Sequence, residues 1–587
     1  MSLFEEGGGV VEVVDGPARA AREVAGVLLS RTLGPLPEGA GSPVWTIGGA
    51  GPVGIDAGDE RAAQAACGVM AVHGRAGGAP APLLAEYVST VTGVLAAQGA
   101  TAALLARAHG RAPLRTGTSL AQGALLTVTQ YLAAATAESD DPAPPSGPGL
   151  ATLVTADAVR VEIETLDPTA WAGFWRRLGV PSRTAGHGWL PFQSRFGTAV
   201  CPLPPELRAA VAAHPLEAVR HAGAAHGVSV VEVGESTTAP VLAPWTLEPA
   251  PLSLLPPHRV PAAAPEADAL PLAGVRVVES ARRVQGPLAG HVLRMLGADV
   301  VRVEPPGGDP QRALPPVAGG CSVRFSALNH GKSVVEADLT TRQGRDTVGE
   351  LVSGADVFLH NWAPGKDRDL GLDAAALHTL NPRLVYASAS GFGTALGPVP
   401  PIGTDYLAQV HGGLAAALRP SDEPPAPSLM TVTDVLGGLV LAQAVLAGLL
   451  AREATHRGCR VSSSLLSAAA LVPRPAPRAA LAPLDRPLPT ADGLLCLGAE
   501  ARTRPREVAG TVGAGGPETV ARRLRDRTTE EWLTALRTAG LPSVAVRTDL
   551  AALAAEPAFA RAVLPPDAHQ PYARPAAPWS FTEQTDR

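Results

Sequence analysis

Short apolar runs and longer periodic segments alternate through the second half of the chain. The run at 275–280 (VRVVES) is typical of a strand buried on both faces of a parallel sheet. The segment at 283–297 repeats its apolar residues with helical spacing. Further candidates follow in alternation, with strands at 298–304, 332–339, 355–361 and 382–390 and helices at 342–355 and 375–381. This order predicts parallel strands joined by crossover helices, and ligands bind beyond the carboxyl ends of such strands.

A long apolar segment of the second half has a counterpart in the first half. Residues 428–452 match residues 83–107 at a constant offset of 345, which pairs Gln98 with Gln443. Two further blocks recur in the same order, 154–163 with 489–498 and 216–233 with 530–546. Ordered recurrence predicts an internal duplication in which insertions have changed the loops.

The predicted duplication gives two unequal copies. In the first copy, 10–29 resembles the first strand and helix and 42–54 resembles a later strand, with too few residues between them for the intervening strands. The expected domains are a degenerate large domain with the long helix at 1–148, a small domain at 149–245, a Pro/Ala-rich linker at 246–271, a complete large domain at 272–470, a second small domain at 471–550 and a C-terminal return segment at 551–587.

Composition limits the classes of partner and ligand. The 587 residues are 46% hydrophobic and 17% charged, which suits several buried cores. A net charge of −6 without a Lys/Arg cluster argues against a nucleic-acid partner. The five cysteines are scattered, with no CxxC and no paired histidine spacing, so we expect no disulfide framework and no metal site. A cytoplasmic location fits these thiols.

One apolar stretch resembles a membrane span. Residues 435–451 contain no charged side chain, but their length is at the lower limit for crossing a bilayer. Gln443 and several glycines within the stretch favour a buried helix of a soluble protein, so we expect no membrane partner. The first residues of the chain lack the order of a signal peptide.

Several ordered segments of the second copy carry a family resemblance. They are PLAGVRVVES (271–280), RVQGPLAGHVLRMLGADVVRVEPPGGD (283–309), ADVFLHNWAPGKDRDLGLD (355–373), TDYLAQVHGG (404–413) and VTDVLGG (432–438). Together they resemble class III CoA-transferases, the family of formyl-CoA and carnitine CoA-transferases and of α-methylacyl-CoA racemase. The resemblance implies an α/β fold: a parallel, Rossmann-like large domain and a smaller α/β domain, duplicated here in one chain as a pseudo-dimer.

The resemblance assigns the chemistry to Asp434. In the transferases of the family an aspartate attacks the acyl-CoA thioester, and Asp434 is the matching residue, just before the long apolar helix. We expect the helix dipole and free backbone N–H groups to keep this carboxylate ionised. A plain helix N-cap would explain the same aspartate without the resemblance. The implied reaction forms an aspartyl acyl anhydride and passes CoA to a carboxylic acid, with acyl-CoA as substrate and no permanently bound cofactor.

The resemblance also implies contacts to CoA. The matching positions are Val284, Gln285, Ala337, Thr340, Asn361, Trp362 and Arg368. Asp369 occupies the place of an expected arginine, which leaves the adjacent Arg368 as the candidate phosphate contact. Lys332 matches a common basic position, although an ordinary exposed lysine explains it as well.

Two other functions are compatible with this sequence. Racemases of the family move an α-proton with a His–Asp pair in a GHD motif, but the matching stretch here is Gly403-Thr404-Asp405. Threonine is no base near neutral pH and His411 lies seven residues away, so a transferase is favoured over an acyl-CoA racemase or isomerase. The other alternative is a catalytically inactive CoA-binding scaffold, because Asp434 aligns with Ser89 in the first copy.

The family resemblance also predicts how the copies assemble. In the family two identical chains interlock, and the partner's small domain completes each site. We therefore expect 149–245 of this chain to cover the Asp434 site, and a further homodimer of the fused chain is also compatible. Serine at position 89 cannot form an anhydride, so we expect no chemistry in the first copy.

Overall fold

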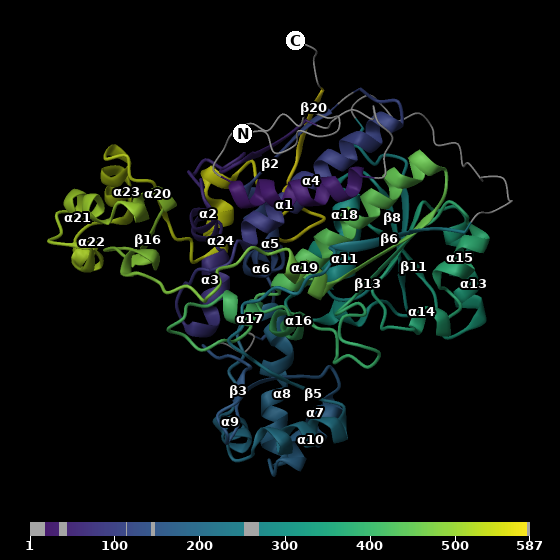
Figure 1. The fold of residues 1–587 in the computed structure, drawn as a ribbon, viewed down its shortest axis with the longest axis horizontal. Coiled ribbons are helices and arrows are strands. Elements are labelled where there is room, and N and C mark those ends of the chain that lie inside the picture. Colours follow the sequence, from purple (N-terminus) through teal and green to yellow (C-terminus); the bar gives the residue numbers. More distant parts are fainter. Residues whose placement is uncertain (1–17, 35–43, 113, 143–146, 252–268, 584–587) are drawn as a thin grey trace.

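The second half of the protein is built on one seven-stranded sheet (Figure 1). The computed structural model describes all residues except 1–17, 35–43, 113, 143–146, 252–268 and 584–587. In spatial order the strands are β11 (Ser333–Glu336), β8 (Asp299–Glu304), β7 (Arg276–Ser280), β12 (Val357–His360), β13 (Val385–Ser390), β14 (Cys459–Ser464) and β6 (Trp245–Pro249). All neighbours run parallel except β6, which is antiparallel to β14.

The strand order creates a crevice at the centre of this sheet. From β7 the chain first adds β8 and β11 on one side and then returns to add β12, β13 and β14 on the other. The carboxyl ends of β7 and β12 thus lie side by side where the order reverses, which is the usual ligand position in such sheets. The strands and helices predicted between 275 and 390 are confirmed, including α11 (Gln285–Met295), α13 (Arg342–Ser353) and α15 (Ala374–Leu380).

The long helices of the two halves pack against each other. They are α4 (Tyr87–Ala108) and α18 (Val432–Thr455), and both are long and apolar enough to cross a membrane by composition, yet both are buried inside the protein. Gln98 Nε2 donates to the backbone oxygen of Leu439 at 2.7 Å, and Gln443 Nε2 donates to Thr101 Oγ1 at 3.1 Å. The uncharged stretch at 435–451 is therefore a core helix, as the sequence predicts.

The first half carries a smaller sheet of three strands. Strands β1 (Val44–Gly48) and β2 (Leu114–Ser119) run parallel, and β20 (Ser580–Glu583) lies antiparallel to β2. The helices of this half are α1 (Arg19–Leu33), α2 (Glu60–Ala66), α3 (Val69–Gly74), α4, α5 (Leu120–Thr127) and α6 (Thr129–Thr136). The strand expected within 10–17 lies outside the described residues.

Two small antiparallel sheets project from the body of the molecule (Figure 1). The first contains β3 (Leu153–Val154), β4 (Arg160–Glu164) and β5 (Ser229–Glu232), with α7 (Pro168–Arg177), α8 (Ser182–Thr198), α9 (Pro205–Ala212) and α10 (Leu216–His226). The second contains β15 (Leu488–Pro489), β16 (Leu494–Leu497) and β17 (Ser543–Ala545), with α20 (Ala499–Thr503), α21 (Pro505–Val512), α22 (Val520–Leu524) and α23 (Thr529–Thr538).

The strands that follow the two small sheets are exchanged between the halves. Strand β6 follows the first small sheet and pairs with β14 of the second half. Strand β20 follows the second small sheet and pairs with β2 of the first half. The linker expected at 246–271 therefore begins too early, because 246–249 lie in β6, whose ladder with β14 satisfies their backbone groups. Within that predicted linker, 252–268 lie outside the described residues.

Candidate active site

Asp434 lies in the first turn of α18 and is half-buried. It follows the short helices α16 (Asp405–His411) and α17 (Leu414–Ala417), and α19 (Leu465–Ala470) packs against α18. Burial raises the pKa of Asp434 well above its usual value, and repulsion from Asp405 adds to the shift. The guanidinium of Arg283 acts in the opposite direction, so its charge favours the ionised carboxylate.

Asp405 occupies the N–H groups at the start of α18. Its Oδ1 accepts hydrogen bonds from the backbone nitrogens of Thr433 (2.6 Å) and Asp434 (2.8 Å), and its Oδ2 accepts from Gln409 Nε2 (2.6 Å). The expectation that free N–H groups would keep Asp434 ionised is therefore wrong, because another carboxylate already uses them. Burial raises the pKa of Asp405 to about 6.

Arg283 brings positive charge to Asp434 from the loop after β7. Its φ of 67° lies in the left-handed region, which is uncommon for a residue with a side chain and costs of order 1–3 kcal/mol. Its guanidinium makes no hydrogen bond or ion pair with any described residue. Burial lowers the pKa of this group, and Asp434 is the neighbouring charge that most opposes that shift. Sequence reasoning missed Arg283, although it directly precedes the predicted pair Val284 and Gln285.

The first small sheet reaches into the same region. Glu164, the last residue of β4, accepts a hydrogen bond from Thr404 Oγ1 (3.0 Å) and pairs with Arg195 of α8 (2.9 Å). The side chains of Glu164 and Arg195 are both 0% exposed. The Arg195 guanidinium also lies over the rings of Phe192 and Tyr406. Residues from the first half thus contact the start of α16, the helix whose first residue is Asp405.

Gln285, at the start of α11, packs against α18 about one turn after Asp434. The residue is buried, and its Nε2 has no hydrogen-bond partner among the described residues. Two glycines of α18 allow this close approach: a Cβ at Gly438 would lie 2.7 Å from the Gln285 backbone oxygen, and one at Gly437 would lie 3.0 Å from its Nε2. Val284 directly precedes the helix and is also buried. An unused amide donor therefore lies one turn from the candidate nucleophile.

The other positions predicted to contact CoA follow strand ends at the same edge of the sheet. Asn361 links the segments that follow β12 and β7. Its side chain accepts a hydrogen bond from the backbone nitrogen of Arg282 and donates one to the Arg282 backbone oxygen, both at 2.9 Å. Trp362 packs against His360 with 4.5 Å between ring centroids. Ala337 and Thr340 follow β11, which is separated from β12 by the two strands β8 and β7. Ala337 is buried, whereas Thr340, and Arg368 in α14 (Lys366–Asp369), are exposed.

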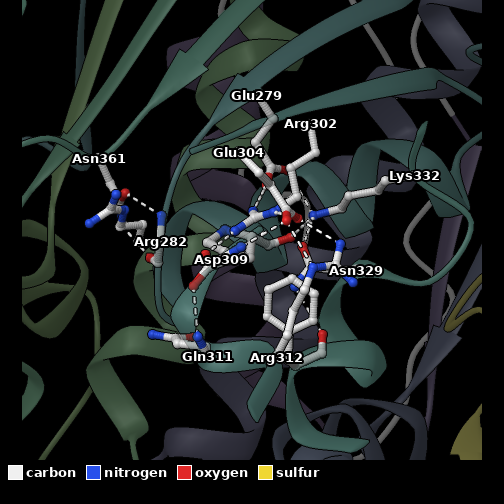
Figure 2. Close-up of polar contacts among 12 residues, drawn as sticks. Glu279, Arg282, Arg302, Glu304, Asp309, Gln311, Arg312, Asn329, Lys332 and Asn361 are labelled. Carbon is white, nitrogen blue, oxygen red and sulfur yellow. Dashed lines mark hydrogen bonds and ion pairs between the residues drawn. The ribbon is translucent and has the colours of Figure 1, made fainter. Parts of the chain in front are cut away.

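A buried ion network fills the space beyond β7 and β8 (Figure 2). Arg302 pairs with Glu279 (2.5 Å), Glu304 (3.0 Å) and Asp309 (2.6 Å). Lys332 donates to Glu279 (2.7 Å) and to the backbone oxygen of Pro287 (2.7 Å), and its side chain is 0% exposed. Lys332 is therefore not an exposed lysine, and its bonds are already committed within the protein. Burial lowers its pKa to about 8.

The start of α4 in the first half has a matching arrangement. Glu60 accepts hydrogen bonds from the backbone nitrogens of Val88 (2.9 Å) and Ser89 (2.6 Å) and from Gln64 Nε2 (2.7 Å). At the offset of 345, Glu60, Gln64, Val88 and Ser89 correspond to Asp405, Gln409, Thr433 and Asp434. The Ser89 hydroxyl donates to Glu86 at 2.9 Å, and burial followed by repulsion from Glu86 raises the pKa of Glu60 to about 7.

Comparison with known proteins identifies the family. The model of CoA-transferase family III matches residues 45–246 and 272–493. The chain belongs to CoA-transferase family III.

Curated relatives match one part of the chain. Succinate–glutarate CoA-transferase of Agrobacterium fabrum is 36% identical over 205 residues, which are 33% of this chain and 51% of that protein. Acetyl-CoA:oxalate CoA-transferase of Acetobacter aceti is 34% identical over 198 residues, 33% of this chain and 51% of that protein. The chain spans about half the length of the curated relatives it matches. The crystal structure of a CAIB/BAIF family protein from Brucella suis is 26% identical with a TM-score of 0.45, covering 51% of this chain and 90% of that one.

Proposed function

We propose that this protein transfers CoA from an acyl-CoA to a carboxylic acid, with Asp434 as the nucleophile. The observation that carries the proposal is a half-buried carboxylate in the family-matched position, with a nearby guanidinium that favours its ionised form and an unused amide donor packed against the next turn of α18. The Asp434 carboxylate attacks the thioester carbonyl carbon, the C–S bond breaks, and the CoA thiolate leaves with the electron pair. The product on the enzyme is an aspartyl acyl anhydride.

The second stage regenerates the carboxylate. The incoming carboxylate can attack the acyl carbon of the anhydride, which breaks the bond to Asp434, releases its carboxylate and forms the mixed anhydride of the two acids. It can instead attack the Asp434 carbonyl carbon, which releases the first acid as its carboxylate and leaves the incoming acyl group on Asp434. Attack of the CoA thiolate on the incoming acyl carbon then gives the new thioester and releases the remaining carboxylate. In both routes no atom or electron pair is lost, and no metal or redox cofactor is needed.

Named residues supply the other functions in this proposal. Arg283 favours the ionised form of Asp434, and Gln285 Nε2 can donate a hydrogen bond to the oxyanion that develops on the attacked carbonyl. Val284, Asn361 and Trp362 line the crevice at the reversal of strand order, which suits the pantetheine and nucleotide of CoA. Ala337, Thr340 and Arg368 are proposed as outer contacts to the nucleotide end.

The carboxylic acids are proposed from the relatives alone. The printed names of two relatives include succinate, glutarate and oxalate, which are short dicarboxylic acids. Short dicarboxylic acids are therefore the first candidates as acceptors.

A cytoplasmic location is part of the proposal and is supported by five cysteines that are all free thiols. A racemase gains no comparable support, because Thr404 is not a base and its hydroxyl donates to Glu164.

We also propose that the two halves are copies that form an interlocked pseudo-dimer, with 1–148 and 272–470 as large domains and 149–245 and 471–550 as small ones. The exchanged strands β6 and β20 support this, because β2 and β14 match at the same offset as α4 and α18. The glutamines of the two sites add support: Gln409 bonds to the backbone of Ser428, and Gln64 bonds in the same way to Leu83.

The test of the proposed chemistry is direct detection of the anhydride. The protein is incubated with a panel of acyl-CoAs, treated with hydroxylamine and analysed by mass spectrometry. We expect modification of Asp434 and none in Asp434→Ala. An adduct at another residue, or one that persists in Asp434→Ala, would contradict the assignment.

The pseudo-dimer has a separate test. Residues 271–587 expressed alone should be inactive or self-associate, and a soluble, active monomer would refute the proposed pseudo-dimer.

A further inference from the structure

A cavity of about 390 Å³ lies between α11 and the C-terminal return segment, apart from Asp434. Its walls come from the last turns of α11, the residue after α12 (Val323–Asn329), and the short strands β18 (Val563–Leu564) and β19 (Arg574–Pro575). The first residue of α11, Gln285, packs against α18 one turn from Asp434, whereas Arg294 near the end of α11 borders this cavity. At about 1.5 Å of rise per residue the two positions are roughly 14 Å apart, so the cavity is a separate place in the fold.

The polar groups that line this cavity are basic. They are His291, Arg294, His330 and Arg574, and none of the described residues that line the cavity is acidic. Arg574 pairs with Asp567 at 2.7 Å outside the lining. Arg294 makes no hydrogen bond or ion pair with any residue that the structure describes, and burial alone lowers the pKa of its guanidinium. The cavity therefore holds one guanidinium whose charge is not balanced by a protein group.

Both histidines also have unused hydrogen-bonding capacity. His291 is 5% exposed, and its Nδ1 is buried with no partner among the described residues. The Nδ1 of His330 is in the same condition, and the two rings lie 4.7 Å apart in an edge-to-face arrangement. Burial, together with the neighbouring cations, lowers the pKa values of both imidazoles, that of His330 to about 4. Unsatisfied buried polar groups are rare in folded proteins and call for an explanation.

The position of Arg294 depends on a glycine. Gly331 adopts a φ of 73°, and a Cβ at this position would overlap the Arg294 guanidinium. The neighbouring Lys332 is not available to the cavity, because it is bound to Glu279 and Asn329 (Figure 2). The basic character of the cavity thus rests on Arg294, with Arg574 and the two imidazoles around it.

The remaining wall is apolar. Leu270, Met295, Leu564 and Pro575 line it. We propose that this cavity binds a small aliphatic carboxylate, with the carboxylate group on Arg294 and the hydrocarbon chain on the apolar wall. A guanidinium matches the planar geometry of a carboxylate and can donate two parallel hydrogen bonds. An inorganic anion such as phosphate would satisfy Arg294 but would make no use of the apolar wall.

The test is calorimetric titration of the full-length protein with hexanoate, hexanamide and inorganic phosphate. We expect hexanoate to bind and hexanamide to bind at least about tenfold more weakly, because a charge-assisted hydrogen bond is lost. Arg294→Gln should weaken hexanoate binding by a similar factor, whereas the matched control Arg342→Gln, whose side chain is 90% exposed on α13, should not. Equal binding of hexanamide, or of phosphate, would overturn the proposal.

Two further variants separate this cavity from the candidate active site. Asp434→Asn should retain hexanoate binding, and its loss there would mean that hexanoate binds at Asp434 and would overturn the proposal. Should Arg294→Gln fail to fold, Ala577→Trp places an indole at the exposed rim of the cavity and should block hexanoate by volume alone. Unchanged binding in Ala577→Trp would equally overturn the assignment.

Discussion

The start of α18 and the start of α4 present the same hydrogen bonds with different chemistry. In each, a buried carboxylate, Asp405 or Glu60, accepts from two consecutive backbone N–H groups and from a glutamine one turn later. The second of these N–H groups belongs to Asp434 in the second half and to Ser89 in the first half. Capping of a buried helix terminus is needed for folding in both places. Its persistence therefore says nothing about catalysis, which depends on the residue beside it.

The two regions also differ in what faces the helix terminus. Near Asp434 lie the guanidinium of Arg283 and the carboxylate of Glu164. Glu164 forms a fully buried ion pair with Arg195. The region of Ser89 is approached by the second small sheet, where Arg61 and Arg502 contact Asp485 through partly exposed side chains. The two helix starts therefore share their capping arrangement and differ in the charged groups around it.

The largest effect is expected when Asp434 is given the residue of the first half. Asp434→Ser removes the carboxylate that forms the anhydride, so CoA transfer should fall at least about a thousandfold. The reciprocal change Ser89→Asp should leave the rate unchanged and give no second hydroxylamine-trapped site. Steady-state transfer assays and mass spectrometry measure both variants. A rate for Asp434→Ser within tenfold of the wild type would remove Asp434 from the mechanism.

Breaking the buried ion pair of Glu164 with Arg195 should destabilise the protein much more than breaking the partly exposed pair of Asp485 with Arg502. Arg195→Met leaves Glu164 buried without its partner, which should lower the free energy of unfolding by about 3–5 kcal/mol. Arg502→Met removes a partly exposed partner of Asp485, and about 1 kcal/mol or less is expected. Urea unfolding compares the two. Equal losses in the free energy of unfolding would mean that the buried and the partly exposed ion pair contribute equally to stability.

A smaller effect is expected on the pH dependence of the reaction. In the proposed mechanism Asp434 must be ionised to attack. The value of kcat/KM should therefore be highest above the pKa of Asp434 and should fall as the pH drops through that pKa. Arg283→Gln removes the charge that favours ionisation, so the acidic limb should move upward by about one pH unit. Arg282→Gln, at the neighbouring position, should move it less. A profile that is unchanged in Arg283→Gln would argue against this electrostatic role.

The smallest effect concerns Glu60 in the first half. Its pKa is raised to about 7, so the folded state binds an extra proton between the usual value near 4.5 and 7. Stability should therefore be greatest at low pH and decrease as the pH rises to about 7. Glu60→Gln should reduce this decrease, and the slope that remains comes from Asp405, Glu162 and Asp434, whose pKa values are also raised. Thermal unfolding across this pH range measures the slope, and an unaltered slope would mean that Glu60 titrates normally.

Sequence periodicity was sufficient for the regular parts of the fold. The apolar runs at β7, β8 and β12 are largely buried within the sheet, and their strand character follows from composition. Strand β6 was taken for linker because five residues that include a proline carry too little periodicity, and its pairing with β14 is a contact across about two hundred residues.

The candidate site was only partly predictable for a similar reason. A motif located Asp434 at the start of a helix, but the partners of that helix terminus come from distant segments. Arg283 acts through a left-handed backbone, and Glu164 meets Thr404 across 240 positions. Asp405 was noted only as the neighbour of Thr404, because no local pattern reveals which N–H groups a carboxylate will accept from.

The exchanged ladders, β6 on β14 and β20 on β2, have a consequence for how this molecule responds to dilution. Two separate subunits held by such ladders would dissociate at low concentration, whereas one continuous chain keeps the effective concentration of each half high and fixes their ratio at one to one. In the proposed pseudo-dimer, this covalent link would allow one half to carry serine at position 89 without producing mixtures of active and inactive pairs.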